Sequence, residues 1–234
     1  YRQRAHCNPL SNNDGFEYPA CPDEMDWTPF YPNLKDPVVD FVDVGCGFGG
    51  LTIALATLYP DKVVLGMEIR PKVCEFVKLK CEALRKEQNT HENASAMRTN
   101  CMRYLPNFFR VNQFEKMFFC FPDPHFKVKN HRRRIINDSL LTEYAYFLKP
   151  NGRLYAITDV EDLHQWHVEK CDAHPLFERL DDASVLQDDP AVRAIIEETE
   201  EGKKVARMGG SKYYAVYRRI TDEEFPQPAI LQVL

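Results

Sequence analysis

One carboxylate in this chain stands between two prolines, in the segment 121–126, Phe-Pro-Asp-Pro-His-Phe. The apolar run 116–120 before it is too short for a helix and rich in aromatic residues, which predicts a buried strand. The prolines fix the backbone, so Asp123 is held at the carboxyl end of that strand, where α/β sheets bind ligands. The segment therefore predicts an acidic group that contacts a substrate. The alternative is a proline-stabilised turn with a solvated Asp.

A glycine-rich segment, 43–50, reads Asp-Val-Gly-Cys-Gly-Phe-Gly-Gly and follows a β-branched run. Glycines such as Gly45 and Gly47 allow a tight turn and the close approach of a ligand. The string fits the G-x-G-x-x-G of NAD(P) enzymes and also the D-x-G-x-G-x-G of S-adenosylmethionine (SAM) enzymes. NAD needs a pyrophosphate at the helix N-terminus, whereas SAM carries a sulfonium and an ammonium that Asp43 would favour. Together with Asp123, this acid favours SAM over NAD.

Further polar groups follow the next strands of the predicted sheet. Glu68 ends the second strand, where an acid can accept hydrogen bonds from both ribose hydroxyls of NAD or SAM. The alternative is a helix-start acid paired with Arg70. Asn100 and Cys101 follow the third strand, where an adenine edge would lie, and Cys120 would lie beside the same pocket.

A basic cluster follows Asp123, although the formal net charge of the chain is −5. Its cations are Lys127, Lys129, Arg132, Arg133 and Arg134, with His131 among them. A local basic patch can bind phosphate on an acidic protein, so we predict that this loop contacts RNA. The alternative is a solvated charge run.

Four potential metal ligands, His164, His167, Cys171 and His174, follow helical spacing. Such a face could bind zinc. We interpret it as packing and predict no metal, because Trp166 and the apolar neighbours account for the helix and helical metal sites usually take ligands from other elements.

From residue 38 onward, strand and helix patterns alternate. The predicted strands are 38–44, 62–69, 94–99, 116–121, 153–158, 177–180 and 213–220. The predicted helices are 51–59, 71–86, 135–148 (closed by the turn 149–152), 160–173 and a broken helix over 191–207. Alternating units of this kind predict an α/β fold with a mostly parallel sheet covered on both faces. Short connections before the last two strands predict one antiparallel strand.

Length and composition suit one sizeable globular domain, with 234 residues of which 44% are hydrophobic. We predict a proline- and aromatic-rich extension over 1–37, a catalytic domain over 38–220 and a tail over 221–234. Eight cysteines without a Cys-x-x-Cys pair indicate a reducing compartment, the cytosol or nucleus. No apolar run approaches the roughly 20 residues that span a bilayer, so no membrane association is expected.

With these residues in view, the chain resembles the catalytic subunits of eukaryotic tRNA (guanine-N7)-methyltransferases. The resemblance runs through nearly the whole chain and includes 1–6, 24–27, 43–50, 65–70, 105–109, 117–127, 142–146, 157–160, 174–179 and 199–205. It implies a class I SAM-dependent methyltransferase fold, with a seven-stranded sheet. It also implies methylation of a guanine in the tRNA variable loop and a non-catalytic WD-repeat partner subunit. Of the reducing compartments, we predict the nucleus, with or without a cytoplasmic pool.

The resemblance also implies roles for individual residues. Asp123 resembles the catalytic acid. Cofactor contacts are implied at Gly45, Glu68, Ile69, Asn100, Cys101 and Cys120, and a further ligand-binding segment at Thr199, Glu200 and Glu201. Asp43, Gly47 and Arg70 complete the candidate cofactor site. Residues 199–201 also suit a helix N-cap with an acidic first turn, and that reading is compatible with ligand binding. Cys101 stands where the family pattern has Ala.

Two other functions compete with this one. Pro-Asp-Pro is similar to the (D/N)-P-P-(Y/F) segment of enzymes that methylate exocyclic amines of nucleobases, although His125 replaces the expected aromatic residue. The chain could also be an RNA-binding scaffold without activity. The presence of Asp43, Glu68 and Asp123 argues against a scaffold.

Overall fold

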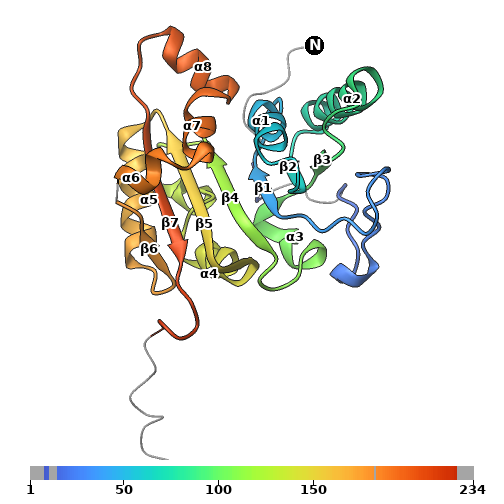
Figure 1. Cartoon of the computed structure of the whole chain (residues 1–234). Helices are drawn as coiled ribbons and strands as arrows, with labels where there is room; N and C mark the ends of the chain where they lie inside the picture. The colour runs from blue at the N-terminus through green and yellow to red at the C-terminus, as the bar shows by residue number, and fades with distance from the viewer. Residues whose placement is uncertain (1–7, 11–14, 182, 226–234) are drawn as a thin grey trace, which may run out of the picture.

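The computed structural model describes residues 8–10, 15–181 and 183–225 (Figure 1). Its strands are β1 (Phe41–Val44), β2 (Val64–Glu68), β3 (Ala94–Arg98), β4 (Phe114–Cys120), β5 (Leu148–Thr158), β6 (Phe177–Arg179) and β7 (Tyr213–Arg219). Its α-helices are α1 (Gly50–Leu58), α2 (Pro71–Gln88), α3 (Cys101–Phe108), α4 (Asp138–Phe147), α5 (Glu161–Ala173), α6 (Ala183–Gln187), α7 (Pro190–Glu197) and α8 (Glu200–Arg207). The segment 1–6 and residues 226–234 of the predicted tail lie outside the described residues.

The strands form one sheet in the order β3-β2-β1-β4-β5-β7-β6. All neighbours pair in parallel except β7, which is antiparallel to both β5 and β6. The predicted α/β fold with one antiparallel strand is therefore confirmed. The strand order reverses between β1 and β4, and a reversal of this kind opens a crevice outside the carboxyl ends of the strands.

Helices cover both faces of the sheet, and successive residues of β4 show how its two faces are filled. Phe119 packs on Tyr144 of α4, with ring centroids 4.7 Å apart. Phe118, on the opposite face, stacks on Tyr155 of β5 at 4.7 Å, within the core that includes α1, α2 and α7. Because both faces are buried, the central strands are mostly apolar, as is typical of parallel strands, and Asp43 of β1 and Lys116 of β4 are exceptions.

The segment 15–34 lies against the α3 end of the sheet, beside β3 and α3 (Figure 1). Trp27 stacks on Phe109 with ring centroids 5.7 Å apart, and the buried Tyr31 hydroxyl donates to the carbonyl of Val64 at 3.0 Å. Tyr31 therefore belongs to the core, and Trp27, Phe30 and Leu34 pack against it. Among the described helices, none combines the length and apolarity needed to cross a bilayer.

Helices α3 and α6 were missed, and the turn predicted over 149–152 was wrong. Helix α3 was not predicted, because Pro106 lies inside it; the helix begins instead from a side-chain cap, in which Asn100 accepts from the Met102 amide. The turn 149–152 does not close α4. The helix ends at Phe147 and β5 begins at once, since Leu148 already pairs with Phe114 and the irregular stretch becomes part of the strand.

Candidate active site

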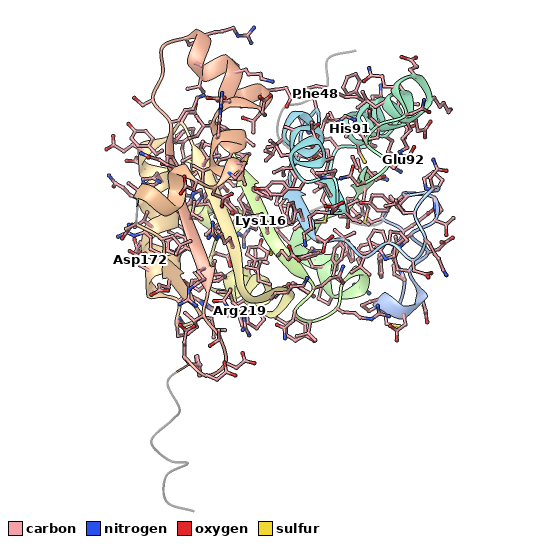
Figure 2. All side chains as sticks on the ribbon, viewed as in Figure 1. Phe48, His91, Glu92, Lys116, Asp172 and Arg219 are labelled. Carbon is pink, nitrogen blue, oxygen red and sulfur yellow. The ribbon has the colours of Figure 1, made fainter. Side chains whose placement is uncertain are left out.

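A cavity of about 560 Å³ opens at the carboxyl edge of the sheet. In Figure 1 this edge lies at the top, where the arrows of β1 and β4 point. Figure 2 shows Phe48, from the glycine turn, at this edge and Arg219, the last residue of antiparallel β7, at the opposite one. The cavity wall includes all of the predicted cofactor residues and the predicted catalytic acid: Asp43, Gly45, Gly47, Glu68, Ile69, Arg70, Asn100, Cys101, Cys120, Asp123, Thr199, Glu200 and Glu201.

The glycine turn between β1 and α1 bends the chain at the floor of the cavity. Gly45 and Gly47 have φ angles of 78° and 54°, in the left-handed region where side chains are disfavoured. The amides of Gly45 and Cys46 both donate to the carbonyl of Met67, at 2.8 and 3.0 Å. These bonds tie the turn to the end of β2 and place β1 and β2 side by side at the cavity.

Asp43 is the most deeply buried acid of the site, with 2% of its surface exposed. Its Oδ2 accepts from the Thr52 hydroxyl at 2.8 Å. The pKa of Asp43 is raised to about 7, mainly by burial and further by the charges of Glu200 and Glu68, while the Thr52 bond works to lower it. Asp43, Glu68 and Glu200 thus place three carboxyl groups near one part of the cavity wall, which favours a cation over a pyrophosphate. These residues therefore fit SAM better than NAD.

Glu68 at the end of β2 is buried and paired with Arg70. One carboxylate oxygen accepts from the backbone and Nε of Arg70 at 2.9 and 3.1 Å, and the other from Nη2 at 2.7 Å. The pairing of Glu68 with Arg70, which was the alternative to ribose binding, is thus present. A carboxylate offers about four lone-pair sites, so this pairing leaves acceptor capacity for a ribose.

Asn100, Cys101 and Cys120 form the neighbouring wall. Asn100 caps α3 with its oxygen, while its Nδ2 donates to the carbonyl of Pro9 at 2.7 Å. Burial raises the pKa of the Cys101 thiol to about 12 and that of Cys120 well above its ordinary value. Both thiols are protonated at neutral pH, so they shape the wall and do not act as nucleophiles.

The start of α8 reaches the cavity from outside the sheet. Thr199 caps this helix by accepting from the Gly202 amide at 2.9 Å, and Glu200 and Glu201 form its acidic first turn. A Cβ at Gly50 would clash with the carbonyl of Glu198, at the end of α7, and lie 2.8 Å from Oε1 of Glu200, so only glycine lets the start of α8 approach α1 this closely. Residues 199–201 therefore form a helix cap and line the cavity at the same time.

Asp123 lies just beyond β4, in a loop whose two ends are strained. Phe121 and His125 have φ angles of 49° and 45°, left-handed values that cost a non-glycine residue about 1 kcal/mol or more each. The His125 amide donates to Asp123 Oδ1 at 3.2 Å, and Nδ1 of His125 is 3.7 Å from Oδ2. The Asp123 side chain is 29% exposed. Strain of this kind is maintained by the surrounding structure and concentrates at functional sites.

The basic segment divides into three parts. Lys127, Lys129 and Arg132 are exposed and lie outside the cavity wall. Arg133 lines the cavity, and its buried Nε has no hydrogen-bond partner among the described residues. Arg134 departs from the prediction, because it is only 6% exposed and does not lie on the open basic face.

Several cavity residues were missed from the sequence. Thr99 lines the wall with a buried hydroxyl that has no hydrogen-bond partner in the part of the chain described here. Asp159 and Val160 reach the cavity from the end of β5, and Lys204 from α8. The signal for Asp159 was available, since it follows a predicted parallel strand as Glu68 does.

The four potential metal ligands predicted on one helical face have different surroundings in the structure. His167 and Cys171 are buried, His164 stacks on Tyr213 with ring centroids 5.7 Å apart, and His174 lies 5.4 Å from the ring of Phe177. Over the described residues, no three metal-binding side chains converge on one point.

Comparisons with known proteins point to methyltransferases. A family model described as "Putative methyltransferase" matches residues 37–215. The chain is 51% identical over 230 residues to a tRNA (guanine-N(7)-)-methyltransferase of Schizosaccharomyces pombe, covering 94% of this chain and 84% of that protein. It is 50% identical to the Caenorhabditis elegans protein of the same name, covering 98% and 89%. The crystal structure of the aminoglycoside resistance methyltransferase NpmB1 matches with a TM-score of 0.50 at 15% identity, covering 78% of this chain and 87% of that one, which shows a shared fold alone.

Proposed function

This chain belongs to the tRNA (guanine-N7)-methyltransferase family, and we propose that it transfers the methyl group of SAM to N7 of a guanine in the variable loop of tRNA. The observation that carries the proposal is the single cavity shared by the acidic glycine turn and Asp123. A site that binds SAM alone would not need a strained, proline-clamped acid on the same wall.

The cofactor half of the cavity is formed by residues suited to each part of SAM. SAM, when bound, supplies a methyl group on a positively charged sulfur. The carboxyl groups of Asp43 and Glu200 would favour its sulfonium and ammonium groups, because opposite charges attract strongly at a buried site. Glu68 would accept from the ribose hydroxyls, and Asn100 and Cys101 would border the adenine.

Asp123 is suited to hold the guanine. N7 bears an in-plane lone pair and no proton, so the reaction needs no base there and depends on positioning and electrostatics. A carboxylate can accept from guanine N1–H and the exocyclic amine together, a two-point contact that selects guanine. Its negative charge also favours the positive charge that N7 methylation places on the ring. The bond from the His125 amide holds the carboxylate in place for this contact.

The exposed face of the basic segment is suited to RNA. Lys127 and Lys129 alternate with Phe126 and Val128, which are 73% and 80% exposed. Cations that contact phosphates beside an open aromatic ring that can stack on a base are the combination used to bind unpaired RNA. With Arg132, these side chains would guide the variable loop toward Asp123.

We further propose a WD-repeat protein as the partner, which the family resemblance supports, and the nucleus as the compartment. Co-expression of the chain with a WD-repeat subunit should yield a stable heterodimer with a lower KM for tRNA than the chain alone. A fluorescent fusion should concentrate in the nucleus. Gel filtration, tRNA titrations and microscopy test these expectations separately.

The decisive experiment is transfer of radiolabelled methyl groups from SAM to bulk tRNA, with and without the partner. Borohydride–aniline cleavage then locates N7-methylguanine, and mass spectrometry detects methylation of exocyclic amines. Cleavage within the variable loop is the expected result. A labelled methyl group on an exocyclic amine would show that the enzyme methylates that amine and not N7. Binding of SAM without any methyl transfer would indicate a scaffold.

A further inference from the structure

Arg134, at the end of the basic segment, is anchored to the loop that carries Asp123. Its Nε donates to the carbonyl of Pro124 at 2.9 Å. Its guanidinium carbon lies 4.7 Å from the centroid of the Trp166 ring on α5. Because Arg134 is almost completely buried, its charge is not presented to a ligand at the surface.

The bond to Pro124 acts on Asp123 through one peptide unit. The carbonyl of Pro124 and the amide of His125 belong to the same peptide bond, which is planar and rigid. Arg134 holds the carbonyl side of this unit, and the amide side donates to Asp123 Oδ1 at 3.2 Å. Rotation of the peptide plane would therefore move the donor that fixes the carboxylate.

The loop needs support of this kind from outside. Proline has no N–H to donate, so Pro122 and Pro124 contribute no backbone donors of their own. The left-handed φ angles of Phe121 and His125 at the two ends are unfavourable for side-chain-bearing residues. The conformation thus depends on surrounding contacts, of which the Arg134 bond is one.

Trp166 in turn fixes the guanidinium. The indole Nε1 donates to the carbonyl of Ile136 at 2.8 Å, which sets the plane of the ring. Lys170 Nζ lies 4.9 Å from the ring centroid and pairs with Asp138, at the start of α4, at 3.2 Å. The ring therefore joins α5 to the loop before α4, and Arg134 is the side chain that extends from this junction to the Asp123 loop.

We infer that Arg134 is a positioning residue of the methyl-transfer site, which orients the Asp123 carboxylate through the planar Pro124–His125 peptide while Trp166 holds its guanidinium. The inference rests on the proposed contact of Asp123 with guanine. It assigns Arg134 to the chemistry of the site, in place of the phosphate contact predicted from its sequence neighbours.

The test is a pair of identical substitutions, Arg134→Met and Arg132→Met, measured with purified enzyme, SAM and tRNA. For Arg134→Met we expect kcat to fall about tenfold, with the KM for tRNA within twofold of the parent, because misplacement of a reacting group lowers kcat. For Arg132→Met we expect the KM for tRNA to rise and the salt dependence of binding to weaken. Arg134→Lys should behave like Arg134→Met, because Lys keeps the charge but cannot reproduce a planar stacked guanidinium.

A phosphate role would give different results. The inference is overturned if Arg134→Lys leaves kcat almost unchanged. It is also overturned if Arg134→Met raises the KM for tRNA and flattens the salt dependence of binding, as Arg132→Met is expected to do. Calorimetric titration with SAM shows whether each variant retains its cofactor site. If the Arg134 variants do not fold, Trp166→Leu and Trp166→Phe carry the test. Trp166→Leu should lower kcat several-fold more than Trp166→Phe, and equal values would overturn the inference.

A double variant separates this inference from the proposed function. In an Asp123→Asn background, Arg134→Lys should cause no further loss of kcat, because the carboxylate that it positions is absent. The same factor of loss in both backgrounds would overturn the positioning role. If Asp123→Asn alone keeps full kcat, the proposed role of Asp123 fails together with the inference. If Asp123→Asn loses activity and Arg134→Lys does not, only the positioning role fails.

Discussion

Two buried aspartates, Asp189 and Asp43, lie at opposite edges of the sheet and differ in the charge of the groups around them. Asp189, at the amino edge, is 6% exposed and accepts from Arg153 and Tyr155 at 2.7 and 2.5 Å, with Lys116 at 3.3 Å. Burial works to raise its pKa, but these partners outweigh burial and the pKa lies below its ordinary value. Figure 2 shows Lys116 in the middle of the molecule, between the helices of the two faces.

Asp43, at the carboxyl edge, is buried as deeply but is paired differently. The described groups that shift its pKa are a hydroxyl and two further carboxyl groups, and none of them is a cation. An acid neutralised by its own chain stabilises the fold, whereas an acid surrounded by acids is suited to a cationic ligand. The comparison therefore separates a structural edge from a binding edge.

The largest effect is expected from Asp189→Asn. Removal of a charge from a buried ion-paired cluster leaves Lys116 and Arg153 poorly compensated, so the free energy of unfolding should fall by about 3 kcal/mol. Urea denaturation measures this loss. The KM for SAM of the folded variant should stay within twofold of the parent, and a large change in that KM would contradict the assignment of this edge to structure alone.

Asp123→Ala should lower kcat on the order of 100-fold or more, by analogy with the removal of one electrostatic contact to a transition state. Its stability should change little, because the side chain is partly exposed. Single-turnover kinetics with purified tRNA measure the chemical step. Near-normal turnover would remove Asp123 from the reaction.

His167 adds a third buried group, with both ring nitrogens lacking a hydrogen-bond partner among the described residues. Burial lowers its pKa to about 3 from an ordinary 6.5. As the pH falls, His167 of the unfolded state binds a proton at a higher pH than His167 of the folded state. Stability is therefore lost as the pH falls below 6.5. The loss should be about 2 kcal/mol between pH 6.5 and 5, at 1.36 kcal/mol per unit. His167→Phe should remove most of this loss in urea titrations at the two pH values; an unchanged loss would assign it to other groups.

Asp43→Asn should weaken SAM binding about tenfold, because a cation loses its buried counter-charge. The pKa of Asp43 is higher in the folded state than in the unfolded state. The free energy of unfolding of the parent therefore falls as the pH rises from 4 toward 7. The variant should therefore be more stable than the parent at pH 8 and similar to it at pH 4. Calorimetry at pH 8 and denaturation at both pH values test the two statements, and a less stable variant at pH 8 would contradict them.

The smallest effect is expected at the exposed basic face. Replacement of Lys127, Lys129 and Arg132 by Ala should raise the KM for tRNA several-fold and reduce the slope of log binding constant against log salt by about 2 to 3. SAM affinity should not change, because these residues lie outside the cavity wall. An unchanged salt slope would show that tRNA is bound elsewhere.

The sequence was informative wherever a local pattern carried the structure. The strands, the glycine turn and the Asp123 segment each depend on neighbouring residues, and their patterns placed them at one edge of the sheet. Arg134 could not be placed this way, because its burial depends on Trp166, 32 positions later in the chain. Helix α3 was missed for a different reason, because its signal is local: the Asn100 cap next to it outweighs the effect of Pro106.

Gly50 has a consequence for how variation can alter the cofactor site. The space that a methyl group would fill there is taken by the Glu198 carbonyl and the Glu200 carboxylate. Even alanine would push the start of α8 away from α1, and the acids of α8 would retreat from Asp43. The affinity for a cation is thus governed in part by a residue that has no side chain to contact it.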